Sequence, residues 1–209
     1  MNSATKEMTL PTALVGSIPR PSWYTRSLHG QDFKMALSDR GFREQYIDAV
    51  GAYINDQECA GLDIIVDGDA RFDDDVGGRG WFFYLIDRLG GFAERTDRQD
   101  NWAAMTQPGR ILWELMEAYQ APVLTEKVSL RAPLHYAAIW QVTQKLTDRP
   151  VKFGAIAVDS VFHMIQNRHY DSDVEFLMDL AAIVNAEYRH LSAVGCPIIQ
   201  IEEPMLHLL

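Results

Sequence analysis

Short apolar runs alternate with helical patterns along this chain, and this alternation limits the fold more than any other feature. The apolar runs cover residues 12–17, 62–67, 150–156 and 197–201. Between them, apolar residues recur every three or four positions over residues 39–60, 133–146 and 172–194. Alternation of this kind predicts parallel strands joined by crossover helices. The unbroken apolar character of the runs indicates strands that are covered on both faces.

Glycines and a capping pattern set the expected helix ends. Gly61 and Gly195 stand where a first and a last helix would stop, and Ser172 with Glu175 forms a capping box that opens the last helix. Its expected buried stripe is Val174, Leu177, Ala181, Val184, Tyr188 and Leu191.

An excursion at about residues 72–130 separates the second apolar run from the next helix. It contains Asp73 to Asp75, an aromatic run from Trp81 to Tyr84, and the pair Gly90-Gly91. We expect a short helix at the aromatic run, a second helix near residues 111–119 and an extended segment over residues 122–130. The acidic run is interpreted as solvated, and the glycine pair as a loop hinge.

Four β/α units fit either a small open sheet or half of a (β/α)8 barrel, and we favour the half barrel in a single domain over residues 1–209. A whole barrel needs ~250 residues. The last run is apolar, with almost no sequence after it to cover its far edge. Because exposed apolar edges promote aggregation, we expect a second polypeptide, a symmetric copy or a missing C-terminal half to cover it.

Charge and composition limit the classes of partner that the chain is expected to bind. The formal net charge of -10 disfavours binding to nucleic acid and to anionic membranes. No stretch approaches the ~20 apolar residues of a membrane helix, and the N-terminus lacks a signal segment. Cys59 and Cys196 fit neither a metal spacing nor a disulfide framework. These features predict a cytoplasmic protein that acts on a small molecule.

Polar residues gather at the ends of the expected strands, where barrel enzymes and open α/β sheets bind ligands. They are Gly16-Ser17, Asp67 and Asp69, Asp159-Ser160, and Glu202-Glu203. The pair Asp67 and Asp69 could bind a metal ion or an ammonium group, act as acid and base, or simply form a solvated turn. The histidines show no zinc-type spacing, and no phosphate loop or nucleophile elbow is present.

Several segments, in order, resemble the first half of the catalytic barrel of the cobalamin-independent methionine synthase family. They are LVGSIPRP at residues 14–21, IVDGD at 65–69, LTDRPVK at 146–152 and GCPIIQIEEP at 195–204. In that family the second segment usually ends in His-Gly-Glu, and the fourth in Gln-Ile-Asp-Glu-Pro. The resemblance covers nearly the whole chain.

The resemblance implies methyl transfer from a tetrahydrofolate derivative to a thiol that is bound to zinc. The family's zinc ligands all follow the fourth strand, so this chain is expected to carry no metal ligand. A second polypeptide with barrel strands five to eight would supply the zinc. The implied assembly is a split, heteromeric methyltransferase.

The resemblance also implies which residues bind substrate, although it assigns no catalytic residue. The candidates are Val15, Gly16, Ser17, Asp67, Asp69 and Glu202. The backbone of the first three would hold an amino-acid carboxylate, and Asp69 and Glu202 would hold its ammonium group. Asp69 stands where the family has Glu, and Glu202 where it has Asp. The charges are therefore kept, but the first side chain is one methylene shorter and the second one methylene longer. Asp67 replaces the usual His and adds a negative charge, which indicates a rebuilt pocket.

Two other functions fit the same residues. One is a zinc-thiolate enzyme that forms or breaks C–S bonds, like epoxyalkane–coenzyme M transferase. The other is a non-catalytic barrel remnant or regulatory subunit, which the lack of metal ligands would favour. A neighbouring reading frame that encodes strands five to eight would separate the split enzyme from the remnant.

Overall fold

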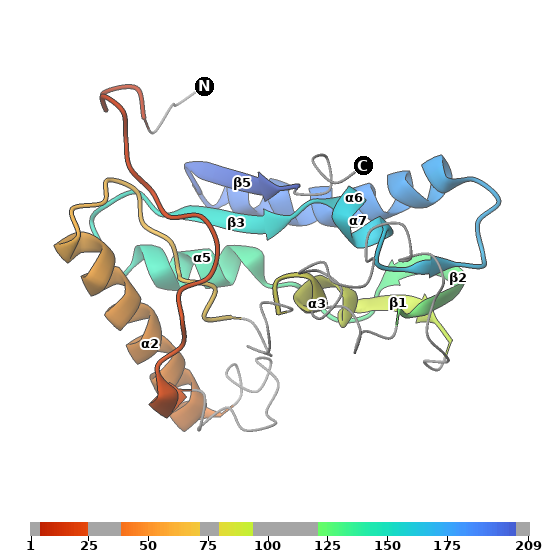
Figure 1. Cartoon of the computed structure of the whole chain (residues 1–209), viewed down its shortest axis with the longest axis horizontal. Coiled ribbons are helices and arrows are strands. Elements are labelled where there is room, and N and C mark those ends of the chain that lie inside the picture. Colours follow the sequence, from red (N-terminus) through yellow and green to blue (C-terminus); the bar gives the residue numbers. More distant parts are fainter. Residues whose placement is uncertain (1–4, 25–38, 72–79, 94–120, 204–209) are drawn as a thin grey trace, which may run out of the picture. The chain divides into compact units, whose positions relative to one another are not determined.

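The computed structural model describes residues 5–24, 39–71, 80–93 and 121–203 (Figure 1). Its elements are α2 (Arg40–Cys59), α3 (Gly80–Ile86), β1 (Leu89–Phe92), β2 (Val123–Leu130), α5 (Tyr136–Gln144), β3 (Lys152–Ile156), α6 (Val158–Phe162), β4 (Gln166–Asn167), α7 (Asp173–Ala193) and β5 (Ile198–Glu202). The chain divides into two compact units. Unit 1 comprises residues 1–84, 134–155 and 186–201, and unit 2 comprises residues 85–133, 156–185 and 202–209.

The predicted order of parallel segments is found mainly in unit 1. Ala13 bridges Ile64, Ile65 bridges Val151, and β3 pairs with β5. The β3 and β5 arrows point the same way in Figure 1. The first two apolar runs form only single bridges rather than full strands. Pro11 lacks a backbone donor, and Gly16 turns the chain with a φ of 84°, which together leave little length for a ladder.

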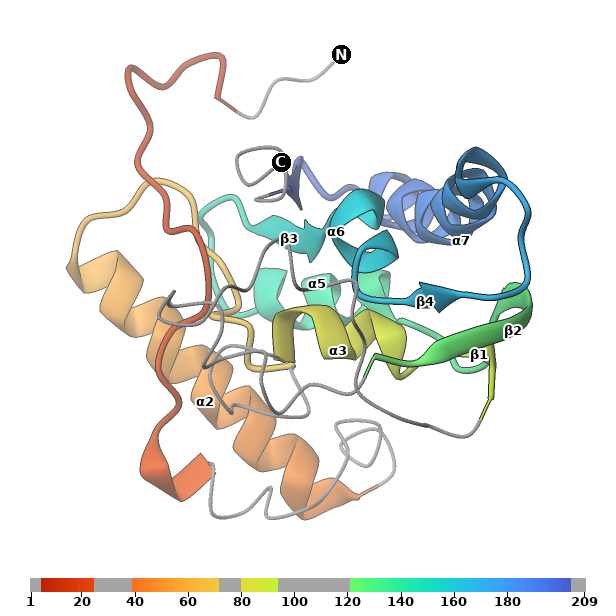
Figure 2. The same ribbon diagram turned by 45° about the vertical axis from the view of Figure 1, so that its right-hand side comes forward.

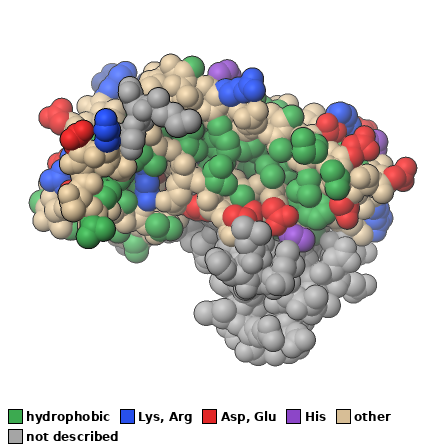
Figure 3. Space-filling model, turned by 90° about the horizontal axis from the view of Figure 1, so that it is seen from above, with side chains coloured by type: hydrophobic (Ala, Val, Ile, Leu, Met, Phe, Trp, Pro, Cys, Tyr) green, Lys and Arg blue, Asp and Glu red, His purple; other side chains and the backbone are tan. Residues whose placement is uncertain are grey.

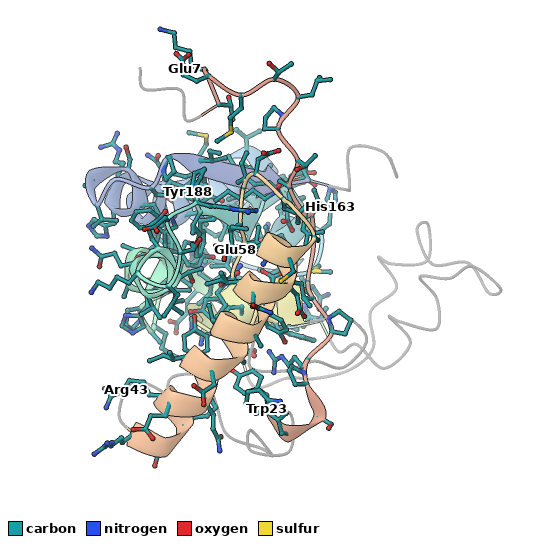
Figure 4. All side chains as sticks on the ribbon, turned by 90° about the vertical axis from the view of Figure 1, so that its left-hand side faces the viewer. Glu7, Trp23, Arg43, Glu58, His163 and Tyr188 are labelled. Carbon is teal, nitrogen blue, oxygen red and sulfur yellow. The ribbon has the colours of Figure 1, made fainter. Side chains whose placement is uncertain are left out.

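The expected ends of the first and last helices are confirmed, whereas the helix expected over residues 133–146 is the shorter α5. Asp39 caps α2 by accepting a hydrogen bond from Phe42 N at 2.7 Å, and Gly61 follows the helix with a φ of 81°. Figure 4 shows Arg43 and Glu58 near opposite ends of α2. Ser172 Oγ accepts a hydrogen bond from Glu175 N, and Gly195 follows α7 with a φ of 93°.

The buried stripe of α7 differs from the expected one. The buried apolar residues of α7 are Phe176, Leu180, Val184 and Leu191, whereas Val174 is 69% exposed. The error has a physical cause: α7 carries apolar residues on more than one face, so spacing alone does not say which face is covered. Met178, one turn after Val174, is exposed as well. Figure 3 shows apolar side chains gathered on one face of the molecule.

Part of the excursion forms a sheet in unit 2. Strand β2 pairs with β1 in antiparallel fashion and with β4 in parallel (Figure 2). The expected short helix is α3, and the expected extended segment is β2. Gly90 and Gly91 were expected to be a loop hinge; this was wrong, because they lie in β1. The register shifts between Gly90 and Phe92, and a Cβ on Gly91 would lie 2.8 Å from Lys127 O. The glycine therefore permits a bulge.

Two further predictions for the excursion concern residues outside the described ranges. These are the acidic run at residues 73–75 and the helix near residues 111–119. Among the residues that are described, no helix is both long and apolar enough to cross a membrane.

Candidate functional site

A tight turn ends the second apolar run of unit 1. Gly68 and Asp69 both have positive φ angles, 66° and 59°. A Cβ on Gly68 would lie 2.5 Å from Cδ2 of Tyr53, on α2, so this position accepts only glycine without movement of the ring. Asp69 N donates to Asp67 Oδ1 at 3.1 Å. The turn thus brings the two acids to one place, as the sequence suggested.

Helix α2 also holds the strand that leads into this turn. The side chain of Gln57 donates to Val66 O and accepts from Val66 N, both at 2.9 Å. Gln57 is buried, and it meets the backbone of Val66 as a neighbouring strand would. The Gln57 contact and the Tyr53 ring beside Gly68 together fix the position of the turn against α2.

Arg71 joins the two acids and was missed from the sequence. Its Nη1 lies 2.8 Å from Asp67 Oδ2 and 2.9 Å from Asp69 Oδ1. Its Nη2 donates to Gly154 O at 2.7 Å, and the guanidinium lies 4.7 Å from the centre of the Phe153 ring. The side chain is 2% exposed. The only sequence signal was a base four residues after an acid, which is common on protein surfaces.

The charges of this cluster support one another. Burial alone would lower the pKa of Arg71, but the charges of Asp67 and Asp69 outweigh it and raise that pKa above its usual value. The guanidinium therefore stays protonated. Burial and the charge of Asp67 raise the pKa of the buried Tyr46, so its phenol stays neutral. The charge of the guanidinium offsets part of the charge of the two carboxylates.

The first apolar run places Ser17 against this turn. Ser17 Oγ donates to Asp69 Oδ2 at 2.8 Å, and Ile18 N donates to Gly68 O at 3.1 Å. Gly16 turns the backbone just before, and a Cβ there would meet no atom within 4 Å. The side chain of Val15 is exposed. Ser17 and Ile18 thus contact the turn at Gly68 and Asp69, although about fifty residues separate the two segments in the chain.

The ends of β3 and β5 carry a second polar cluster, which lies in unit 2. Ser160 Oγ donates to Glu203 Oε1 at 2.6 Å, and Ser160 N donates to Glu203 Oε2 at 3.2 Å. Ala157 N donates to Glu202 O at 2.9 Å. Asp159 Oδ2 lies 3.7 Å from His163 Nε2. The carboxylate of Glu203 therefore caps the start of α6, and Glu202 precedes it at the end of β5.

A metal ion does not fit the described residues. Within the described ranges, no group of three or more His, Cys, Asp or Glu side chains could hold one. The Asp67 and Asp69 carboxylates contact a guanidinium instead. Cys59 is exposed, and burial raises the pKa of Cys196, which disfavours the thiolate that binds zinc. What the cluster of unit 1 can do is present an oriented carboxylate to a cationic group.

The chain is similar to known proteins over most of its length. Residues 10–208 match the family model described as "Cobalamin-independent synthase, Catalytic domain". The methionine synthase of Sulfurisphaera tokodaii is 27% identical over 198 residues, which are 95% of this chain and 53% of that protein. The methionine synthase of Saccharolobus solfataricus is 28% identical over 199 residues, 95% of this chain and 54% of that protein. The chain thus spans about half the length of these relatives.

A solved structure has the same fold. A B12-independent methionine synthase from Shewanella sp. W3-18-1, in complex with selenomethionine, superposes with a TM-score of 0.67 at 24% identity. The match covers 96% of this chain and 53% of that one. This likeness confirms the predicted fold class, half of a (β/α)8 barrel. On the family match over nearly its whole length, the chain belongs to the cobalamin-independent synthase catalytic-domain family.

Proposed function

We propose that this chain is the substrate-binding half of a methyltransferase. The enzyme would move a methyl group between a folate-type carrier, or another methyl donor, and a thiol or related acceptor. The observation that carries the proposal is the placement of Asp69: Ser17 holds one of its carboxylate oxygens and Arg71 holds the other. A carboxylate oriented in this way at a strand end is suited to a ligand's ammonium group.

The proposed pocket combines two kinds of contact. The backbone at Val15, Gly16 and Ser17 would receive the carboxylate of an amino-acid substrate, and the open space beside Gly16 gives room for it. Asp69 would receive the ammonium group; the assignment of Glu202 to substrate binding rests on the resemblance alone. Asp67 would act through Arg71, because its carboxylate forms a two-oxygen contact with the guanidinium.

Strands five to eight and the zinc ligands would come from a second polypeptide. The chain matches only about half of each relative. In the described part of the chain, β5 pairs with β3 alone, and Ile201 of β5 is 57% exposed. An apolar edge of this kind favours pairing with a further strand. Zinc would activate the acceptor thiol there, and the folate donor would bind the assembled barrel.

Co-expression tests this proposal directly. The chain should be produced with a polypeptide that carries barrel strands five to eight, purified as a complex, and assayed for methyl transfer from methyltetrahydrofolate to homocysteine and to other thiols. We expect activity and zinc in the complex and neither in this chain alone. Asp69→Ala should abolish activity but leave the complex intact, whereas Asp148→Ala, at an exposed acid, should change neither. A complex that transfers methyl groups equally well with Asp69→Ala would refute the pocket.

A further inference from the structure

We propose that Arg71 is the resident cation of the strand-end site, a positioning residue that orients Asp69 and restricts the site to an ammonium group rather than a divalent metal ion. This inference rests on the proposed function for the identity of the ligand. Its physical core, the exclusion of a metal ion, does not.

The guanidinium of Arg71 lies between the two carboxylates. Nη1 lies 3.0 and 2.8 Å from the two oxygens of Asp67 and 2.9 Å from Asp69 Oδ1. A cation that bridged both carboxylates would have to occupy this same space. Hard divalent cations require several oxygen ligands, and the two acids are their natural source here.

The side chain of Arg71 is held in place by several contacts. Nη2 is bonded to Gly154 O, the guanidinium packs over Phe153, and the side chain is almost completely buried. The guanidinium cannot move aside for a metal ion without losing all of these contacts. Because the group stays charged, it would also repel an incoming divalent cation.

The charge of Arg71 bears on the ligand. Arg71 offsets part of the negative charge of Asp67 and Asp69, so the pair attracts a divalent ion less strongly and is better suited to a singly charged ammonium group. Ser17 and Arg71 hold the two oxygens of Asp69 from different sides. These contacts orient the carboxylate of Asp69, the group to which the proposed function assigns the ligand's ammonium.

The test uses the whole chain and excess MnCl2 as the probe. Thermal unfolding is followed with and without Mn²⁺ for wild type, for Arg71→Met, and for Arg71→Met combined with Asp69→Asn. We expect no Mn²⁺-dependent shift in wild type, a rise of several degrees in Arg71→Met, and loss of that rise in the double variant. Arg149→Met is the matched control, because Arg149 is bonded to Leu62 O and Glu58 O, away from the turn, and it should show no Mn²⁺ response.

Two outcomes would overturn the inference. One is a folded Arg71→Met that gains no response to Mn²⁺. The other is Mn²⁺ binding to wild type that Asp69→Asn abolishes. Calorimetry measures this binding in wild type and Asp69→Asn, so the test does not require Arg71→Met to fold. Neither readout involves methyl transfer. An enzyme without methyltransferase activity would therefore refute the proposed function and leave this inference standing.

In the assembled complex, Arg71→Lys gives a second readout. Lysine keeps the charge but offers a single nitrogen in place of the planar fork, so it cannot hold Asp67, Asp69 and Gly154 O together. We expect KM for the amino-acid substrate to rise about tenfold or more, with a smaller change in kcat, because a misplaced Asp69 weakens binding. An unchanged KM would show that Arg71 does not position Asp69.

Discussion

Two ionic clusters in the described part of the chain differ mainly in burial. In unit 1, Arg71 pairs with Asp67 and Asp69 and is 2% exposed. In unit 2, Lys127 Nζ lies 2.9 Å from Asp179 Oδ2, and Tyr170 OH donates to the same oxygen at 2.9 Å, but Lys127 is 68% exposed. Both clusters tie together segments that are far apart in the sequence. Water can take over the contacts of the exposed cluster but not those of the buried one. A buried charge without a partner is costly, whereas an exposed charge is solvated.

The largest expected effect comes from removing the buried cation. Arg71→Met should lower the free energy of unfolding by about 3–5 kcal/mol, because it leaves two buried acids without their partner. Chemical denaturation measures this loss. Arg40→Met is the matched control, since Arg40 pairs with Glu44 on the surface, and it should cost less than about 0.5 kcal/mol. Similar losses in the two variants would remove the distinction between buried and exposed clusters.

The turn beneath the buried cluster gives the next effect. Gly68→Ala should lower the free energy of unfolding by about 2–4 kcal/mol, because it adds both an unfavourable φ and a clash with the Tyr53 ring. Gly61→Ala is the control: its φ is 81°, but a Cβ there meets nothing, so about 1 kcal/mol is expected. Equal costs in denaturant unfolding would mean that Tyr53 moves aside.

Ser17→Ala should have a smaller effect on stability and a larger one on function. Loss of one hydrogen bond to Asp69 should cost about 0.5–1.5 kcal/mol. In the assembled complex, substrate affinity should fall further than this stability change suggests, because Asp69 loses one of its two named contacts. Isothermal titration with the amino-acid substrate measures the affinity, and Ser17→Thr, which keeps the hydroxyl, should restore it.

The exposed cluster of unit 2 should give the smallest effect, and one that depends on pH. Hydrogen bonds from Lys127 and then Tyr170 hold the pKa of Asp179 below its usual value. A lowered folded-state pKa means that the stabilisation is present above the unfolded-state pKa and is lost as pH falls through the folded-state pKa. The Tm difference between wild type and Asp179→Asn should therefore be small at neutral pH, begin to decline below about pH 4, and disappear once the pH is below the lowered pKa of Asp179. A difference that grows in acid would contradict this assignment.

The sequence predicts local features of this fold better than it predicts long-range ones. The ends of α2 and α7 follow from caps and glycines within a few residues of each end. The strand order follows from the alternation of runs and helices. The buried face of α7 could not be predicted, because apolar residues lie on more than one of its faces and only the neighbouring elements decide between them. The bulge at Gly91 likewise depends on Lys127 O, a backbone atom of a partner strand.

The candidate site shows the same division. Asp67, Asp69 and Ser17 could be named because they stand at strand ends, and the structure brings them together. Arg71 could not be named, because its role depends on Gly154 O, which is 83 residues away, and on the ring of Phe153. The sequence showed an added negative charge at Asp67, whereas the structure shows that charge paired with Arg71.

The contacts of α2 with the turn matter for any attempt to graft the candidate site onto another protein. Tyr53 supports Gly68 from below, and Gln57 replaces a strand neighbour for Val66. A graft of residues 15–18 and 67–71 alone would arrive without the scaffold that shapes them. A transferable version of the candidate site would therefore include the second half of this helix, and substitutions along that helix could change the geometry of the turn without touching its acids.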